Sequence, residues 1–381
     1  MKQRALWNRR EFVQGMSLAA VGSRLPRPTG ASPLKPRFAY VGSGDSTQGI
    51  AAFAIQGDHW TQVHTISSEH PTALALHPRR HLLYVANEID SYQGLPSGTV
   101  EAYAIDPASG RLTLLNRQPL SLSGTMPRHL AVSPDGSNVV VAVHGGGAYN
   151  VLPIGADGSL ERVSGIVKEV GSGPNAVHQE TAHPQMVLFD TTGRHLLGTD
   201  LGSDRLNVFT LSGDKLAINH RSATQPGSGP RHMALHPAGH LLYVTNHLEA
   251  TVSCYGYDAA SGRLLNRLQD RLQHGTLDGG AGALIIHPSG RFLYTAGKSD
   301  GIAAWRIDST TGALTAAQLW SEGVVSPHAM AMVPDGTGLL VLSRAGDSVV
   351  HLRVDPASGK LSDPSQVASV SSPMSLVLKY A

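Results

Sequence analysis

The chain is poor in cysteine, in aromatic residues and in charge. Its 381 residues include one cysteine, Cys254, so no disulfide can form within the chain. Aromatic residues make up 5% and charged residues 15%. The formal net charge of +2 creates no field that favours nucleic acid, so we expect no nucleic-acid partner. The absence of disulfides fits a cytosolic protein, and it equally fits a protein that folds in the cytosol before export.

Glycine and proline are plentiful by contrast, with 42 and 23 residues. Together with the low charge, they are typical of many short strands joined by tight turns rather than of long helices. The most apolar stretch near the N-terminus, residues 12–23, is too short to span a bilayer, and we expect no membrane span.

The N-terminus resembles a twin-arginine export signal. Arg9 and Arg10 lie in the string NRREFVQ and precede the weakly apolar stretch. A spacer rich in Pro, Ser and Gly follows, so residues 1–36 are predicted to be a signal and linker and the protein to be periplasmic or secreted. The alternative is a basic tail on a cytoplasmic protein.

An internal repeat is the most informative pattern. Each copy has an alternating apolar run, a turn, a second apolar run, a third run and an Asp-x-x-x-Gly turn before a fourth. Four antiparallel strands per copy make one blade of a β-propeller. Copies spaced by roughly 50 residues begin at Pro71, Pro127, Pro184, Pro230, Ala281 and Pro327.

The last copy is split between the two ends of the chain. PMSLVLKY, from Pro373, repeats the opening run and then the sequence stops. FAYVGSG from Phe38 and GIAAFAI from Gly49 supply the runs that should follow it. The sequence therefore predicts one all-β domain, residues 37–381, with seven blades and a ring closed by its C-terminal strand.

Four strings give the chain a family resemblance: YVANE ending at Glu88, HGGGAYNVLPI from His144, DLGSDRLNVF from Asp200 and GSGPRHMALHPAGHLLYVTN from Gly227. With them the chain resembles the seven-bladed β-propeller lactonases, which include propeller-type 6-phosphogluconolactonase and carboxymuconate cyclase. The resemblance implies a reaction on a lactone or a related carboxylate in the central channel, with no cofactor.

The resemblance also implies catalytic residues. Arg231 and His232 stand in the GPRH string, and Glu88 keeps the family's Asn-Glu pair in the second blade. The chain departs from the family's pattern at three places. A second Asn-Glu pair ends in His247, a His-x-His ends in Gln185, and an acid and base of the sixth blade are Ala283 and Ile285.

Repeat register predicts which other side chains meet at one mouth of the channel. These residues follow the leading proline of a copy or end its second run. They would form a positive patch that suits an anionic small molecule. The alternative is that these arginines and histidines satisfy backbone groups of neighbouring blades. The predicted substrate-binding residues are Arg128, His129, Gln185, His247, Lys298 and Arg344.

Other features are interpreted as structural. His77, His236 and His287, which precede turn prolines, are predicted to stabilise turns, and Asp204 and Asp347 to bond local backbone donors. Residues 145–147 are three glycines without the Lys-Ser/Thr of a phosphate loop. No histidine or cysteine cluster has ligand spacing, so we expect no metal.

Two functional hypotheses remain open. The first is an enzyme that opens or forms a lactone, with Arg231 stabilising charge on the carbonyl oxygen, Arg128 binding the substrate's anion, and His232 or Glu88 as the base. The second is an exported, non-catalytic propeller that binds an anionic small molecule or a protein. Export would argue against a phosphorylated cytosolic sugar lactone as the substrate. A monomer is expected in both cases.

Overall fold

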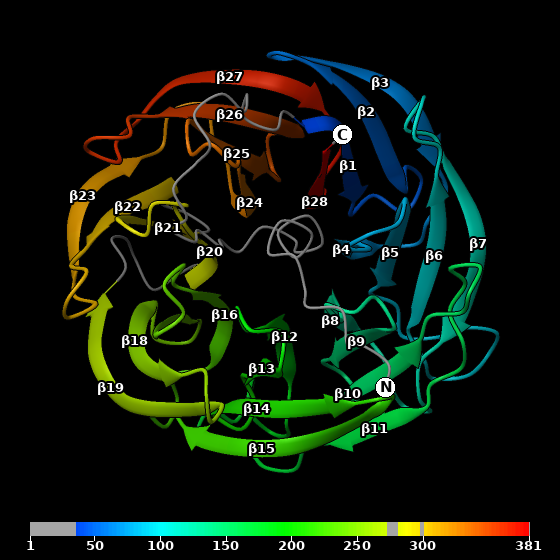
Figure 1. Ribbon diagram of the computed structural model, residues 1–381, viewed down its shortest axis with the longest axis horizontal. Helices are drawn as coiled ribbons and strands as arrows, with labels where there is room; N and C mark the ends of the chain where they lie inside the picture. The colour runs from blue at the N-terminus through cyan, green and yellow to red at the C-terminus, as the bar shows by residue number, and fades with distance from the viewer. Residues whose placement is uncertain (1–35, 273–280, 298–300, 381) are drawn as a thin grey trace, which may run out of the picture.

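The computed structural model describes residues 36–272, 281–297 and 301–380. These residues form 28 strands in seven four-stranded antiparallel sheets, and they contain no helix. Figure 1 shows the sheets arranged as blades around a central axis, with β4, β8, β12, β16, β20, β24 and β28 innermost. The seven-bladed propeller predicted from the repeat is confirmed.

The first four blades, each written from the axis outward, are β28 (Pro373–Tyr380), β1 (Pro36–Ser43), β2 (Ile50–Gln56) and β3 (His59–Ile66); β4 (Pro71–Leu76), β5 (Leu82–Asn87), β6 (Thr99–Ile105) and β7 (Leu112–Pro119); β8 (Pro127–Val132), β9 (Asn138–Val143), β10 (Ala148–Pro153) and β11 (Gly165–Lys168); β12 (Pro184–Phe189), β13 (His195–Asp200), β14 (Arg205–Ser212) and β15 (Lys215–Ala223). The other three are β16 (Pro230–Leu235), β17 (Leu241–Asn246), β18 (Thr251–Asp258) and β19 (Arg263–Leu272); β20 (Ala281–Ile286), β21 (Phe292–Gly297), β22 (Gly301–Ile307) and β23 (Leu314–Trp320); β24 (Pro327–Met332), β25 (Gly338–Ser343), β26 (Ser348–Val354) and β27 (Leu361–Ser369).

Burial changes from the second strand of each blade to the fourth. The second strands, such as β5 and β9, are buried along their whole length. Their continuous Leu and Val runs fit this position, because the neighbouring blades cover both faces. The fourth strands β3 and β7 consist mostly of exposed and half-buried positions. The core therefore consists of layers between adjacent blades, as the separate apolar clusters show.

Histidines of the HP turns tie one blade to the next. The Nε2 atoms of His77, His236 and His287 lie 3.2, 2.9 and 3.0 Å from the carbonyl oxygens of a turn glycine in the following blade. In His77, Nδ1 accepts the amide of Arg79 at 3.0 Å, so the neutral ring needs its proton on Nε2. Burial lowers the pKa of His77 to about 4 and keeps the ring neutral. The turn role predicted for these histidines is confirmed, and the bond to the next blade extends it.

A second set of inter-blade bonds comes from tyrosines. Tyr40, Tyr84, Tyr243 and Tyr294 are fully buried. Their hydroxyls donate to glycine carbonyls of the next blade at 2.8 to 3.0 Å. A buried phenol requires such a partner, so these bonds specify which turn of the neighbouring blade each ring can occupy.

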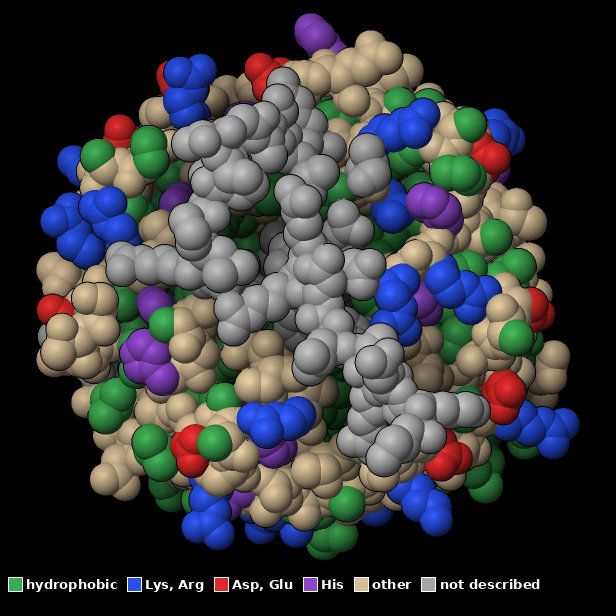
Figure 2. Space-filling view, in the orientation of Figure 1, with side chains coloured by type: hydrophobic (Ala, Val, Ile, Leu, Met, Phe, Trp, Pro, Cys, Tyr) green, Lys and Arg blue, Asp and Glu red, His purple; other side chains and the backbone are tan. Residues whose placement is uncertain are grey.

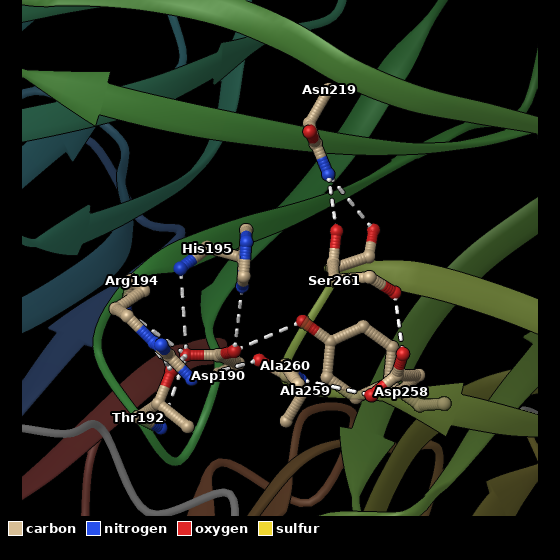
Figure 3. A network of polar contacts seen from close by, with 11 residues as sticks. Asp190, Thr192, Arg194, His195, Asn219, Asp258, Ala259, Ala260 and Ser261 are labelled. Carbon is tan, nitrogen blue, oxygen red and sulfur yellow. Dashed lines mark hydrogen bonds and ion pairs between the residues drawn. The ribbon is translucent and has the colours of Figure 1, made fainter.

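The fourth blade uses a different connection, because Asp190 occupies the position of the turn histidine (Figure 3). Its Oδ2 accepts from His195 Nδ1 at 3.1 Å and from the hydroxyl of Tyr257, in the fifth blade, at 3.0 Å. Asn219 donates to the carbonyl of Ser261 at 2.9 Å across the same boundary. The carboxylate thus performs the joining role that an imidazole performs in the second, fifth and sixth blades.

Ring closure depends on β28, which pairs antiparallel with β1 from Pro36↔Tyr380 to Ser43↔Pro373. Val377 and Leu378 of this strand are each 4% exposed. Without β28, β1 would leave a row of unpaired backbone groups and an apolar edge at the centre of the molecule.

We therefore expect a large loss of stability when residues 373–381 are deleted. The deletion removes one complete strand pairing and its buried side chains, and the melting temperature should fall by roughly 10 °C or more, as expected for a loss above about 4 kcal/mol in a large domain. Thermal unfolding followed by circular dichroism measures this. Deletion of Ala381 alone is the control, and equal melting temperatures for the two truncated chains would contradict the closure.

Candidate functional site

The innermost strands that bear the candidate site residues are irregularly paired at their first residues. In β8, Pro127 pairs with Val143 and His129 with Ala142, so Arg128 lies outside the regular register. Gln185 in β12 is omitted in the same way. In β16 and β24 the irregularity covers two residues, 231–232 and 328–329. Such bulges turn a side chain away from its normal direction, which explains how these residues reach the channel.

A cavity of about 200 Å³ occupies the channel. Two predicted site residues do not line the cavity but lie close to it. His247 contacts Arg231, and Arg344 is exposed and bonds Ser372 at 3.2 Å. Lys298 lies outside the described residues. Six predicted residues line the cavity directly: Glu88, Arg128, His129, Gln185, Arg231 and His232.

Polar groups are confined to one end of this cavity. Farther along the innermost strands, the lining residues are all apolar: Leu74, Ala75, Ala131, Leu188, Met330 and Leu376 among them. On the face shown in Figure 2, the visible acidic side chains lie toward the rim, whereas Lys, Arg and His side chains also lie nearer the centre. The chemistry available to a ligand therefore lies at the polar end.

An ion pair joins the second and third blades at the polar end. Arg128 Nη1 lies 2.6 Å from Glu88 Oε1. Burial raises the pKa of Glu88, and the positive charges of Arg128 and Arg231 oppose that rise. The Oε2 atom of Glu88 has no hydrogen bond to a described residue and is not among the buried polar atoms without a partner, so it is open to a ligand or a water molecule.

Arg231 is the most isolated charge in the site. Burial is the main reason that its pKa is lowered to about 10, and the like charge of Arg128 adds to this. Its Nη1 donates to the neutral acceptor His247 Nδ1 at 3.3 Å. Within the described residues it forms no ion pair with a carboxylate of its own. A desolvated guanidinium in that situation is stabilised by an anion from outside.

His232 lines the cavity as predicted. Its Nδ1 is buried without a partner among the described residues, and the backbone of Gly282, in the next blade, lies close enough to act on the ring. Burial is the main cause that holds the pKa of His232 well below its ordinary value. The role of His232 as the base stays a prediction, and Glu88 is the other candidate for that role.

His129 is buried in the same way. Its Nδ1 is buried and has no partner among the described atoms, and burial lowers the pKa of the ring to about 4. A neutral imidazole at this depth can offer a ligand a hydrogen bond without adding charge. The prediction that His129 faces the channel agrees with its position.

Gln185 connects the cavity to a pair of stacked histidines that the sequence did not identify as site residues. Its Nε2 donates to His144 Nδ1 at 2.7 Å. The rings of His144 and His183 stack with centroids 4.4 Å apart, and burial together with the charge of Arg128 lowers the pKa of His144 to about 3. Gln185 therefore presents an amide to the channel in an orientation that this pair supports.

One further lining residue, His328, shares the register position of the predicted site residues but was not among those predicted to bind substrate. It directly follows Pro327 in β24, as Arg128 and Arg231 follow the leading prolines of β8 and β16. That shared position was the signal that could have found it.

Asp204 positions the loop that leads into Arg231. Its carboxylate accepts the amides of Gly227 at 2.7 Å and Gly229 at 2.8 Å, and it lies 6% exposed. Asp347, at the equivalent place in the last blade, is exposed and accepts the amide of Ser372 at 2.7 Å. The prediction that these aspartates bond only local donors is wrong, because both reach the loop before the next innermost strand.

Replacing Asp204 with Asn should lower the free energy of unfolding by about 1.5–3 kcal/mol, since bonds to a buried charge are lost. Asp347→Asn is the matched control and should cost less than about 1 kcal/mol at an exposed site. Both aspartates have a left-handed backbone, φ +51° and +47°, which Asn tolerates. Urea unfolding measures the difference, and equal losses would show that Asp204 has no special part in holding the loop.

Two kinds of feature are absent from the described residues. No three histidine, cysteine, aspartate or glutamate side chains there come together as metal ligands would. The described segments also contain no helix with the length and hydropathy of a membrane span.

Comparison with known proteins gives one consistent result. The family model for lactonases with a seven-bladed β-propeller matches residues 38–378. A 6-phosphogluconolactonase of Bacillus subtilis is 28% identical over 307 residues, which cover 80% of this chain and 86% of the relative. One from Pectobacterium carotovorum is 30% identical over 308 residues, 77% and 86% of the two chains. A periplasmic gluconolactonase structure from Pseudomonas aeruginosa superposes with a TM-score of 0.78 at 28% identity, covering 90% and 98%.

Proposed function

Because the chain belongs to the seven-bladed β-propeller lactonases, we propose that it hydrolyses the ring ester of an anionic sugar lactone at the polar end of its central channel. The observation that carries the proposal is the excess of positive charge at this end of the cavity. Arg128, Arg231 and the nearby, exposed Arg344 all act on Glu88, the one acidic side chain among the described lining residues, and Arg128 already pairs with it. An anionic substrate would compensate the remaining charge.

In the proposed reaction, a water molecule adds to the lactone carbonyl carbon. Arg231 stabilises the negative charge that develops on the carbonyl oxygen, in a desolvated place where such an interaction is strong. The carboxylate oxygen of Glu88 that is not paired with Arg128 takes the proton of the water. The bond between the carbonyl carbon and the ring oxygen then breaks, and the proton returns from Glu88 to that oxygen. The product is the open hydroxy acid.

Arg128 has two parts in this arrangement. It holds Glu88 by the 2.6 Å ion pair and offers its remaining N–H groups to the substrate's anion. Gln185, His129 and His247 would contribute neutral hydrogen bonds, the last of them through Arg231. All the reacting groups come from bulges or strand ends of different blades, so ring closure must precede assembly of the site.

A panel of sugar lactones, phosphorylated, carboxylated and neutral, tests the proposal by the acid released on hydrolysis. Arg231→Ala should lower kcat/KM by about tenfold or more, the value of one charge-assisted hydrogen bond of roughly 1.5–3 kcal/mol. Glu88→Gln should lower kcat by about a hundredfold or more, as expected for removal of a general base. Arg291→Ala, an exposed arginine that bonds Ala357, is the control and should leave turnover unchanged.

Two outcomes would count against the enzyme. If the protein binds anionic lactones without hydrolysing any, it is a binding propeller. If Arg231→Ala and Glu88→Gln lower stability alone, the two side chains are structural.

We further propose that the protein is exported by means of a twin-arginine signal and that it is a monomer. Support comes from Arg9 and Arg10 in the NRREFVQ string and from the periplasmic location in the name of the Pseudomonas aeruginosa gluconolactonase. Changing both arginines to lysine should block export of a reporter fused after Pro36, because the receptor distinguishes guanidinium from ammonium groups. Fractionation of the cells measures this, and an unchanged periplasmic signal would reject the export pathway.

A further inference from the structure

The imidazole of His328 faces the cavity without a protein partner. It makes no hydrogen bond with the described residues, and neither ring nitrogen is among the buried polar atoms that lack a partner. Since the residue lines the cavity, its nitrogens are open to the channel. The irregular pairing of residues 327–330 in β24 places it there, as the bulges in β8 and β16 place Arg128 and Arg231.

Three positive charges act on this ring from three different elements. They are Arg231 of β16, Arg344 at the end of β25 and Arg128 of β8. His232 lies close enough to interact electrostatically. The lining residues of the adjacent innermost strands, Ala283 of β20 and Ser375 of β28, carry no charge. Burial is the first cause that lowers the pKa of His328, to about 3, and the three guanidinium groups add to it.

We propose that His328 is a further member of the anion-binding cluster and that it binds the ligand's anionic group as an imidazolium, taking up a proton when that group enters the cavity. The proposal rests on the anionic substrate class proposed above. In the empty cavity a fourth cation would repel the three guanidinium groups. A bound sulfate, phosphate or carboxylate neutralises part of their charge, so the cost of protonating the ring falls.

The proton comes from solvent and no covalent bond changes, so the event is a linked equilibrium. The ring is neutral in the free protein at pH 7, and its proton affinity is higher in the complex than in the free protein. Anion affinity must then rise as the pH falls toward the pKa of the complex, and it must become independent of pH well above that value. Because protonation of His328 is linked to anion binding, the charge of the ligand as well as its shape determines whether His328 donates a hydrogen bond to it.

Glu88 could produce a similar pH dependence by another route. Burial raises its pKa, and protonation of its carboxylate would remove a negative charge that repels the ligand. A measurement on the affinity alone cannot separate the two groups. The experiment therefore has to follow the protonation of His328 itself.

Sulfate is a suitable probe, because it keeps two negative charges across the pH range 5.5–7.5. NMR of the histidine ring Cε1–H groups, with His328→Gln to identify the resonance, should show His328 moving toward its protonated shift at pH 5.5 only when sulfate is added. Calorimetry in buffers of different ionisation heat should show proton uptake on binding. The sulfate affinity should rise about threefold or more from pH 7.5 to 5.5, within the tenfold per pH unit that one linked proton allows.

The variants discriminate between the groups. His328→Gln should abolish the proton uptake and most of the pH dependence, whereas Glu88→Gln should keep the proton uptake. His351→Gln, a half-buried histidine on β26 of the same blade and outside the cavity lining, should behave as the unmodified protein. The proposal is overturned if sulfate does not bind, if it binds without changing the His328 resonance, or if His328→Gln keeps the proton uptake. If sulfate binding protonates His328 but the protein hydrolyses no lactone, this proposal is supported and only the proposed enzymatic function is rejected.

Discussion

The pairing of β28 with β1 is the contact on which the other features of the molecule depend. It joins residues 373–380 to residues 36–43, the two ends of the described chain, in one antiparallel sheet. A linear row of blades would leave two apolar edges, and closing the row removes both of them. Closure also creates the channel, because the innermost strands can surround an axis only when the seventh blade meets the first. The cavity and its charges therefore exist only in the completed ring.

Inter-blade bonds then set the precision of that ring. Buried tyrosines and the HP-turn histidines reach carbonyl oxygens of the next blade, and in the fourth blade Asp190 makes the connection with Tyr257 instead. These bonds are directional, whereas the apolar layers between blades would tolerate small rotations. Rigid spacing of the blades lets side chains from blades two, three, five and seven meet at one level. It also explains how buried positive charges can be kept close together at a cost that a ligand offsets.

Much of this arrangement could be predicted from the sequence, because the repeat carries it. The leading prolines, the turn glycines and the split last copy predict the blades, their number and the closure, and register predicts that Arg128, Gln185 and Arg231 share one end of the channel. The failures concern contacts between blades. Asp204 reaches Gly227 and Asp347 reaches Ser372, each in the loop before the next innermost strand, and no periodicity encodes these contacts. His328 was left out of the predicted substrate-binding residues although its place after Pro327 matches that of the two arginines.

We propose that excess positive charge at the polar end of the channel selects an anionic lactone. The most direct measurement compares kcat/KM for a matched pair of sugar lactones that differ only in one anionic substituent, at low and at moderate ionic strength. The anionic lactone should be hydrolysed at least about tenfold faster, and added salt should reduce this advantage because it screens the charges. Equal kcat/KM values for the two lactones at both ionic strengths would contradict it.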